Sequence, residues 1–269
     1  MAKTMTEGAP WKHILKFSLP VLAGSLLQQL YNTVDTIIVG RYSGEDALSA
    51  VGTTGSFAFL FLALATGFSA GNGVVVAQQY GAKNNERVRA NASTCILFLM
   101  ILGVISAVIA CVTATPAYTY LLNVDESIID LTVTYFRWYA IGLVFRFGCN
   151  IFSAILRAVG DSAATLYFLL ISSVLNIGLD MLFVAVFDWG VAGAAVATDI
   201  SQAVSFVAAY FYMSKKYPIF RFRLNEYKWN RSLLSRLRSR SDFLYHCSLS
   251  SFHSDLPSFR EQSMISARL

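Results

Sequence analysis

Charged residues are scarce in this 269-residue chain. Asp, Glu, Lys and Arg make up 14% of it, against roughly 25% in an ordinary soluble domain, whereas 55% of the residues are hydrophobic. A soluble fold of this size needs polar side chains over its whole outer surface, and a mean hydropathy of +0.54 leaves too few of them. The composition therefore excludes an ordinary soluble protein and predicts an integral membrane protein, with the lipid bilayer as its first partner.

The sequence also lacks the motifs with which common enzymes work. Its four cysteines form no Cys-x-x-Cys pair, and it has neither a Gly-x-x-x-x-Gly-Lys-Ser/Thr loop nor a His-Glu-x-x-His motif. We therefore expect no enzyme and no cofactor, and any pumping must draw on an ion gradient. The net charge of +5 comes without a basic face interleaved with aromatic residues, so no nucleic-acid partner is expected.

Six apolar segments are long enough to cross a hydrocarbon core, which takes about 20 helical residues. None alternates strictly between apolar and polar residues as a barrel strand does, so the sequence predicts an all-α bundle of six transmembrane helices. The second segment is rich in glycine and is expected to be tilted or broken near Gly67–Gly73. The six segments run approximately over Ile14–Val39, Leu48–Ala77, Ala92–Thr115, Leu131–Leu156, Thr165–Phe187 and Val191–Met213.

Basic residues fall in every second connection between these segments. The connection Pro116–Asp130, between the third and fourth segments, has three acidic residues and no basic one. Because Lys and Arg mark cytoplasmic loops, both ends of the six-helix unit are expected to be cytoplasmic. The basic connections carry Lys3, Lys12 and Lys16; Lys83, Arg87 and Arg89; Arg157; and Lys215, Lys216, Arg221, Arg223 and Lys228.

The composition changes after residue 230. Residues 231–269 contain 11 serines and six arginines but no lysine, and they hold no seventh apolar segment. We therefore expect residues 1–230 to form the membrane unit and residues 231–269 to form a cytoplasmic tail. A composition of this kind is typical of disordered segments.

Polar side chains inside apolar segments are informative, because burying them costs several kcal/mol unless they are paired or functional. In the first segment Gln28, Asn32 and Asp35 share one helical face at the spacing i, i+4, i+7. In the fifth segment Asn176 and Asp180 share a face at i, i+4. The alternative for Asp35 is a carboxylate that only reaches the outer interface.

The sixth segment adds Thr198, Asp199 and Gln202 to these polar groups. Carboxylate, amide and hydroxyl oxygens together suit a small hard cation, and a single carboxylate would suffice to exchange a proton. A neutral hydrogen-bonded cluster that joins three helices is the alternative. Small residues at the start of the segment, Gly190–Ala197, would allow the close helix approach that either arrangement needs.

Arg146 lies in the middle of the fourth segment and requires an acidic partner, water or the bundle interior. Asp35 and Asp180 are the candidate partners, and the sequence does not choose between them. Pro20 is expected to bend the first helix near its cytoplasmic end, because proline removes one backbone hydrogen bond.

Six short runs, in order along residues 8–235, together resemble the multidrug and toxic compound extrusion (MATE) family. The resemblance implies an antiporter of the plasma (inner) membrane that expels small organic, often cationic, compounds in exchange for sodium ions or protons. It also implies a fold of two six-helix lobes with the substrate bound between them. The matching runs are Leu27–Arg41, Ala47–Gly52, Ala77–Ala82, Ile155–Asp161, Leu175–Asp180 and Gly190–Thr198.

The family's coupling site combines an acid on the first helix with a polar cluster on helices four to six. The resemblance places this site at Asp35, Asn176, Asp180 and Thr198, which are also the candidate sodium ligands, with Asn150 as a weaker match on the fourth helix. The residues expected to line a substrate cavity are Gln28, Asn32, Arg146 and Gln202.

This chain departs from the family pattern, because members have twelve spans and the apolar pattern here stops after six. We interpret the residues beyond Ser235 as the product of a frameshift or truncated gene, so that the chain is an N-terminal half that is inactive alone. Two alternatives stay open. One is a half-transporter that works with a second copy or a separately encoded second lobe, and the other is a channel or scaffold without coupled transport.

Overall fold

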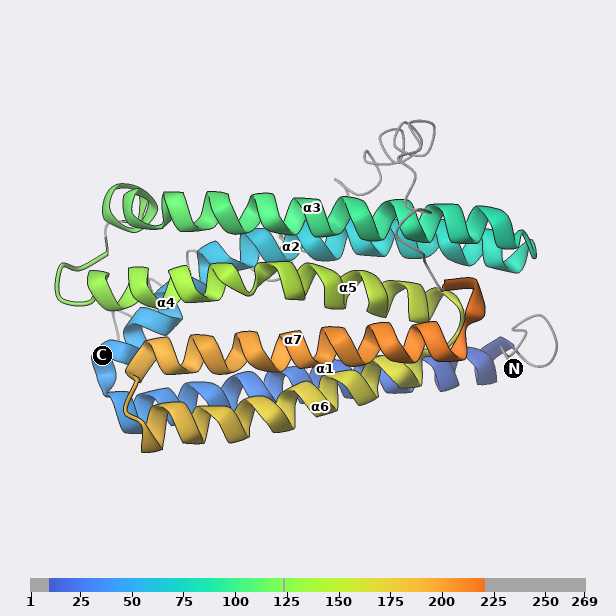
Figure 1. Ribbon diagram of the computed structural model, residues 1–269. Coiled ribbons are helices and arrows are strands. Elements are labelled where there is room, and N and C mark those ends of the chain that lie inside the picture. Colours follow the sequence, from blue (N-terminus) through green and yellow to red (C-terminus); the bar gives the residue numbers. More distant parts are fainter. Residues whose placement is uncertain (1–9, 123, 221–269) are drawn as a thin grey trace. The chain divides into compact units, whose positions relative to one another are not determined.

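The computed structural model describes residues 10–122 and 124–220, with side chains from residue 18 onward. Every regular element in these ranges is a helix (Figure 1). The long helices are α1 Pro10–Ser43, α2 Glu45–Gly81, α3 Asn85–Pro116, α4 Ile129–Ile141, α5 Leu143–Ala158, α6 Ser162–Asp180 and α7 Gly190–Lys216. The π-helical segments η1 Ala117–Leu121 and η2 Met181–Val186 extend α3 and α6, and the short helix η3 Pro218–Phe220 follows α7.

The described residues belong to one compact unit, residues 1–228. The tail expected at residues 231–269, and the frameshift placed near Ser235, lie outside the described residues. The domain boundary at residue 230 and the origin of the tail therefore stay predictions.

Each of the six predicted spans coincides with a helix or a pair of helices. Four helices are both long and apolar enough to cross a membrane, and the bent pair α4–α5 brings the number to five among the described residues. Helix α1 has 34 residues, so its length suffices, but polar residues such as Gln28, Asn32 and Asp35 lower its hydropathy. The fold is therefore an all-helical bundle in which the first helix is the most polar.

The helices form a ring of neighbours. Helix α1 packs beside α6, α6 beside α7, and α7 beside the α4–α5 pair, while α5 also packs against α2 and α3. Buried alanines of α7, including Ala194, Ala195 and Ala197, permit its close approach to the adjacent helices. Large apolar side chains point outward, among them Leu26 and Val112, each 72% exposed, as expected for a surface that faces lipid.

The fourth predicted span, Leu131–Leu156, is formed by a pair of helices. Helices α4 and α5 meet at Gly142 with a bend of 47°. A Cβ atom at Gly142 would overlap the Asp199 carboxylate, so only glycine lets α7 approach this junction so closely. The expected break near Gly67–Gly73 is absent, because α2 is continuous from Glu45 to Gly81.

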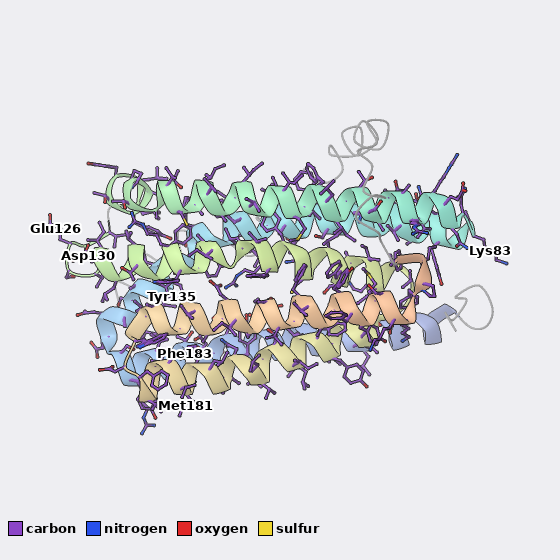
Figure 2. All side chains as sticks on the ribbon, in the orientation of Figure 1. Lys83, Glu126, Asp130, Tyr135, Met181 and Phe183 are labelled. Atoms are coloured by element: carbon purple, nitrogen blue, oxygen red, sulfur yellow. The ribbon has the colours of Figure 1, made fainter. Side chains whose placement is uncertain are left out.

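The two ends of the bundle differ in charge. Figure 2 shows Lys83 at one end and Glu126 and Asp130 at the other. The beginning of α1 and the end of α7 lie at the Lys83 end, as Figure 1 shows. This distribution follows the alternation of basic and acidic connections along the sequence. The turn between α1 and α2 is tight, because Gly44, with φ 90°, is the single residue between the two helices.

Candidate functional site

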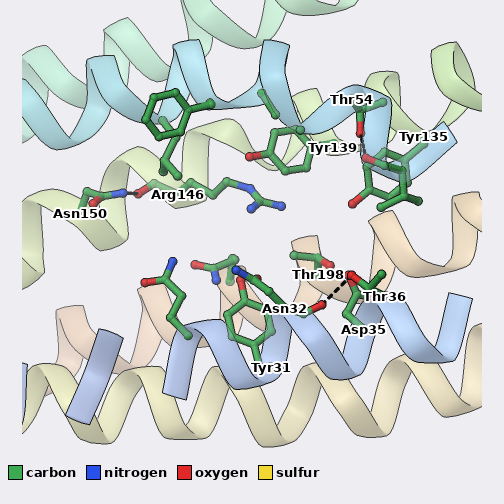
Figure 3. Close-up of a pocket in the computed structure, with 17 residues that line it drawn as sticks. Tyr31, Asn32, Asp35, Thr36, Thr54, Tyr135, Tyr139, Arg146, Asn150 and Thr198 are labelled. Carbon is green, nitrogen blue, oxygen red and sulfur yellow. Dashed lines mark hydrogen bonds between the residues drawn. The ribbon is translucent and has the colours of Figure 1, made fainter. Parts of the chain in front are cut away.

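A cavity of about 320 Å³ opens between α1, α2, the α4–α5 pair and α7 (Figure 3). All four residues predicted to line a substrate cavity contribute to its wall. Three of the predicted coupling residues, Asp35, Asn150 and Thr198, line it as well. The four cavity residues are Gln28 and Asn32 from α1, Arg146 from α5 and Gln202 from α7.

Asn176 and Asp180 do not line this cavity but are buried on α6, at 1% and 0% exposure. The amide nitrogen of Asn176 donates a hydrogen bond to Oγ1 of Thr198 at 3.3 Å, and this hydroxyl donates to the carbonyl of Ala194 at 2.9 Å. The carboxyl groups of Asp180 and Asp35 are close enough to interact directly. The structure thus brings four of the five predicted coupling residues, all but Asn150, together from three helices.

Among the described residues, several buried oxygens of this cluster receive no hydrogen bond from an N–H or hydroxyl group. They are one carboxylate oxygen of Asp35, both carboxylate oxygens of Asp180 and the amide oxygen of Asn176. An unsatisfied buried polar group costs about 1–3 kcal/mol, so these oxygens favour a ligand that carries positive charge or a donated proton. A proton or a small cation would satisfy them, because carboxylate and amide oxygens are hard ligands.

The cluster fits an alkali cation or a proton better than a transition metal. Within the part of the chain that the structure describes, no three His, Cys, Asp or Glu side chains come together. The available donors are instead two carboxylates, one amide and one hydroxyl, all oxygen ligands. Asp35, Asn176, Asp180 and Thr198 are therefore chemically suited to sodium.

Arg146 pairs with Asp199 and not with either predicted partner. Its guanidinium lies 3.5 Å from the Asp199 carboxylate, and the two side chains are 11% and 13% exposed. The same guanidinium lies over the ring of Tyr139, 3.9 Å from the ring centre. Helical spacing could not reveal this pair, because it depends on which face of α7 meets α5. Asp35 and Arg146 nevertheless line the same cavity.

The remaining predicted residues are held by hydrogen bonds of their own. The amide nitrogen of Asn150 donates to the carbonyl of Arg146 on the same helix at 2.9 Å, and that of Gln202 donates to the Ser172 hydroxyl at 3.4 Å. The second bond ties α7 to α6. Both residues present their side chains to the cavity while remaining anchored.

Sequence reasoning missed the aromatic part of the cavity wall. Tyr31, Tyr135 and Tyr139 line it. From sequence alone, a tyrosine in an apolar segment is interpreted as part of the hydrophobic core. It also missed a Gly-x-Ser-x-Gly pattern at Gly67–Gly71. That pattern lies inside the continuous helix α2, without the preceding strand that a hydrolase nucleophile elbow requires, so it gives no reason to expect an enzyme.

With the site described, the chain can be compared with known proteins. The MatE family model matches residues 20–182, which includes α1 with Asp35 and α6 with Asn176 and Asp180. The chain belongs to the MatE family. It is therefore a multi-pass membrane protein of the multidrug and toxic compound extrusion type, as the resemblance implied.

Individual relatives agree with this assignment. The chain is 33% identical over 214 residues to the probable multidrug resistance protein YoeA of Bacillus subtilis (strain 168), covering 78% of this chain and 46% of that protein. It is 27% identical over 228 residues to the multidrug export protein MepA of Staphylococcus saprophyticus, covering 85% and 50%. These names describe drug resistance and export, and neither names a catalytic activity.

A solved structure shares the fold of this MATE protein. A multidrug resistance MATE family transporter of the MOP superfamily, in an outward-facing conformation, superimposes with a TM-score of 0.74 at 29% identity, covering 84% of this chain and 50% of that one. The chain thus spans about half the length of the relatives it matches, and its six-helix bundle corresponds to one lobe of such a transporter.

Proposed function

We propose that this chain is the N-terminal lobe of an exporter that moves small organic, often cationic, compounds out across the plasma membrane in exchange for sodium ions or protons. The observation that carries the proposal is the set of buried oxygens on Asp35, Asn176 and Asp180 that receive no hydrogen bond from an N–H or hydroxyl group among the described residues. The relatives' names, multidrug resistance and multidrug export, support the substrate class.

The proposed coupling starts from repulsion between two buried carboxylates. Asp35 and Asp180 lie close together, so a bound cation or proton stabilises the cluster by removing like-charge repulsion. Asp35 is on α1, which also carries Pro20, the position where a missing backbone hydrogen bond makes the helix easiest to bend. Binding at the cluster would therefore bias the shape of α1, lower the affinity for the drug and permit rocking between inward-open and outward-open states.

Export needs a second lobe in this proposal, because the substrate cavity of a two-lobe transporter lies between the lobes. We propose that the chain alone is inactive. The partner is a second lobe, supplied as a second copy of this chain or as a separately encoded unit. The beginning of α1 and the end of α7 both lie at the Lys83 end of the bundle. We propose that this end is cytoplasmic, since basic connections mark that side.

Cation binding by the purified chain in detergent tests the coupling site. We expect sodium chloride, titrated against choline chloride at constant ionic strength, or a fall in pH, to raise the unfolding temperature. The increment should be lost in Asp35→Asn and Asp180→Asn, because each removes a charged ligand. Asp188→Asn is the matched control, since Asp188 is an exposed carboxylate between η2 and α7. An increment unchanged in the two cluster variants would show that the coupling site lies elsewhere.

Ethidium efflux by cells expressing the chain tests the need for a second lobe. The expected result is the same efflux as with an empty vector. Efflux above that baseline, abolished by Asp35→Asn, would contradict the proposal of an inactive half and would favour a working dimer of this chain.

A further inference from the structure

A second cavity lies in the half of the bundle nearer the Lys83 end. It encloses about 220 Å³ between α1, α5 and α6, with Gln202 of α7 at its edge. It shares Gln28, Asn150 and Gln202 with the first cavity, so a polar zone continues from the Asp35 cluster towards this end of the bundle. The coupling proposal gives this second cavity no role.

The second cavity carries a positive charge. Arg157 is the one Asp, Glu, Lys, Arg or His side chain in its described wall. Asn150, Ser153 and Arg157 project from one face of α5 at the spacing i, i+3, i+7. Further polar groups of the wall come from α1, α6 and α7, namely Ser25, Gln28, Thr165 and Gln202. The apolar part of the wall includes Val21 of α1 together with Leu166 and Leu169 of α6.

The acid closest to Arg157 along the chain is already occupied. One carboxylate oxygen of Asp161 accepts hydrogen bonds from Lys216 at 2.8 Å and from the hydroxyls of Tyr212 and Tyr217 at 3.0 Å each. Among the described residues, no hydrogen bond or ion pair engages the guanidinium of Arg157. The guanidinium, with five N–H donors, therefore belongs to a cavity wall and has no anionic partner among the described residues.

This arrangement differs from that of an arginine that merely reaches water. A snorkelling side chain extends away from the bundle, whereas Arg157 is only partly exposed and lines an internal space. Its position in the last turn of α5 is favourable for the helix dipole, but that interaction leaves the guanidinium donors free. Arg157 is therefore suited to hold an anion that comes from outside the chain.

We infer that this cavity binds the phosphate group of an anionic membrane lipid. Guanidinium pairs with phosphate through two parallel N–H···O bonds, and basic pockets between transmembrane helices on the cytoplasmic side suit lipid headgroups. The volume corresponds to about seven water molecules at ~30 Å³ each, enough for a phosphate and part of a glycerol. The apolar wall from α1 and α6 would meet the start of the acyl chains.

This assignment is independent of the transport proposal, since it concerns neither Asp35 nor Asp180. A bound lipid would lie between α1 and α5, the helices that carry Pro20 and Arg157. Loss of cation binding would leave the lipid site intact, and loss of the lipid site would leave cation binding intact.

The test compares lipids added to the delipidated chain in a neutral detergent. Phosphatidylglycerol should raise the unfolding temperature by about 5 °C more than phosphatidylcholine at the same mole fraction, as expected for a saturating ligand on a chain of this size. This increment should vanish in Arg157→Gln. It should persist in Arg137→Gln, the matched control, because Arg137 is an arginine of α4 that bonds the Thr115 hydroxyl at 3.1 Å far along the bundle.

Two further measurements distinguish a lipid site from a site for a free anion and replace a variant that does not fold. Inorganic phosphate, compared with chloride at equal ionic strength, should give no increment that depends on Arg157. If it gives one, the site takes a free anion and the lipid assignment is overturned. If Arg157→Gln does not fold, native mass spectrometry of Arg157→Lys replaces it, with weaker retention of phosphatidylglycerol expected. Equal retention of phosphatidylglycerol and phosphatidylcholine by the wild-type chain would also overturn the assignment.

Discussion

Replacing Arg146 by methionine tests whether the buried ion pair holds α5 against α7. The guanidinium lies 3.5 Å from the Asp199 carboxylate and 3.9 Å from the centre of the Tyr139 ring. Methionine keeps much of the side-chain length but removes the charge and every donor. The variant therefore leaves Asp199, whose side chain is 13% exposed, without a cation to compensate it.

The expected loss of unfolding free energy depends on which charged group each variant leaves unpaired. Removing one partner of a buried pair costs about 3–5 kcal/mol when the other charge stays uncompensated, and we expect this loss for Arg146→Met. Asp199→Asn should cost less, about 1–3 kcal/mol. In that variant Arg146 keeps its contact with Tyr139 and still faces Asp35 across the cavity. The double variant should lose less than Arg146→Met alone, because no unpaired charge remains buried.

The assay is the free energy of unfolding of the purified chain in detergent, combined in a double-mutant cycle. We expect a coupling energy of about 1–3 kcal/mol between Arg146 and Asp199. Arg137→Met serves as the matched control, with an expected loss below about 1 kcal/mol because its contact is a single hydrogen bond to Thr115. Losses that simply add, with a coupling below about 0.5 kcal/mol, would refute the reasoning.

Two other sites give separate predictions. Gly142→Ala should cost about 2–4 kcal/mol, since the new Cβ would push the Asp199 carboxylate away from Arg146, and differential scanning fluorimetry would record the loss. Burial raises the pKa of Asp161, but hydrogen bonds from Lys216 and the neighbouring tyrosine hydroxyls outweigh it and hold the pKa below its usual range. Asp161 should therefore stabilise the fold fully above about pH 4 and lose this effect as the pH falls through its lowered pKa. Asp161→Asn should remove about 1–2 kcal/mol at pH 7, a modest amount because Lys216 is 45% exposed, and a stability–pH profile unchanged by this variant would contradict the assignment.

The positions of the helices could be predicted because each span is a local feature. An apolar run of about 20 residues has one stable form in lipid, a helix with all its backbone groups bonded internally. The same local reasoning placed Gln28, Asn32 and Asp35 on one face of α1, and all three line the cavity. It also paired Asn176 with Asp180 on α6, and the structure brings that pair to Thr198 and Asp35.

The bend at Gly142 could not be predicted from its surroundings. Glycine inside an apolar helix has many uses, and here its reason is the carboxylate of Asp199 on α7. The partner of Arg146 could not be predicted from the sequence for the same reason. Asp35 and Asp180 were plausible by charge, yet the choice depended on which face of α7 the neighbouring helix meets.

The sequence by itself determined that this protein lies in a membrane, where its helices run, and which of their faces are polar. These properties depend on composition and on a period of 3.6 residues within single segments. The tertiary structure alone decided which polar faces meet, where the fourth span bends, and that two cavities share Gln28, Asn150 and Gln202. Contacts between segments distant in sequence depend on how side chains of different helices pack together, and no local pattern encodes that packing.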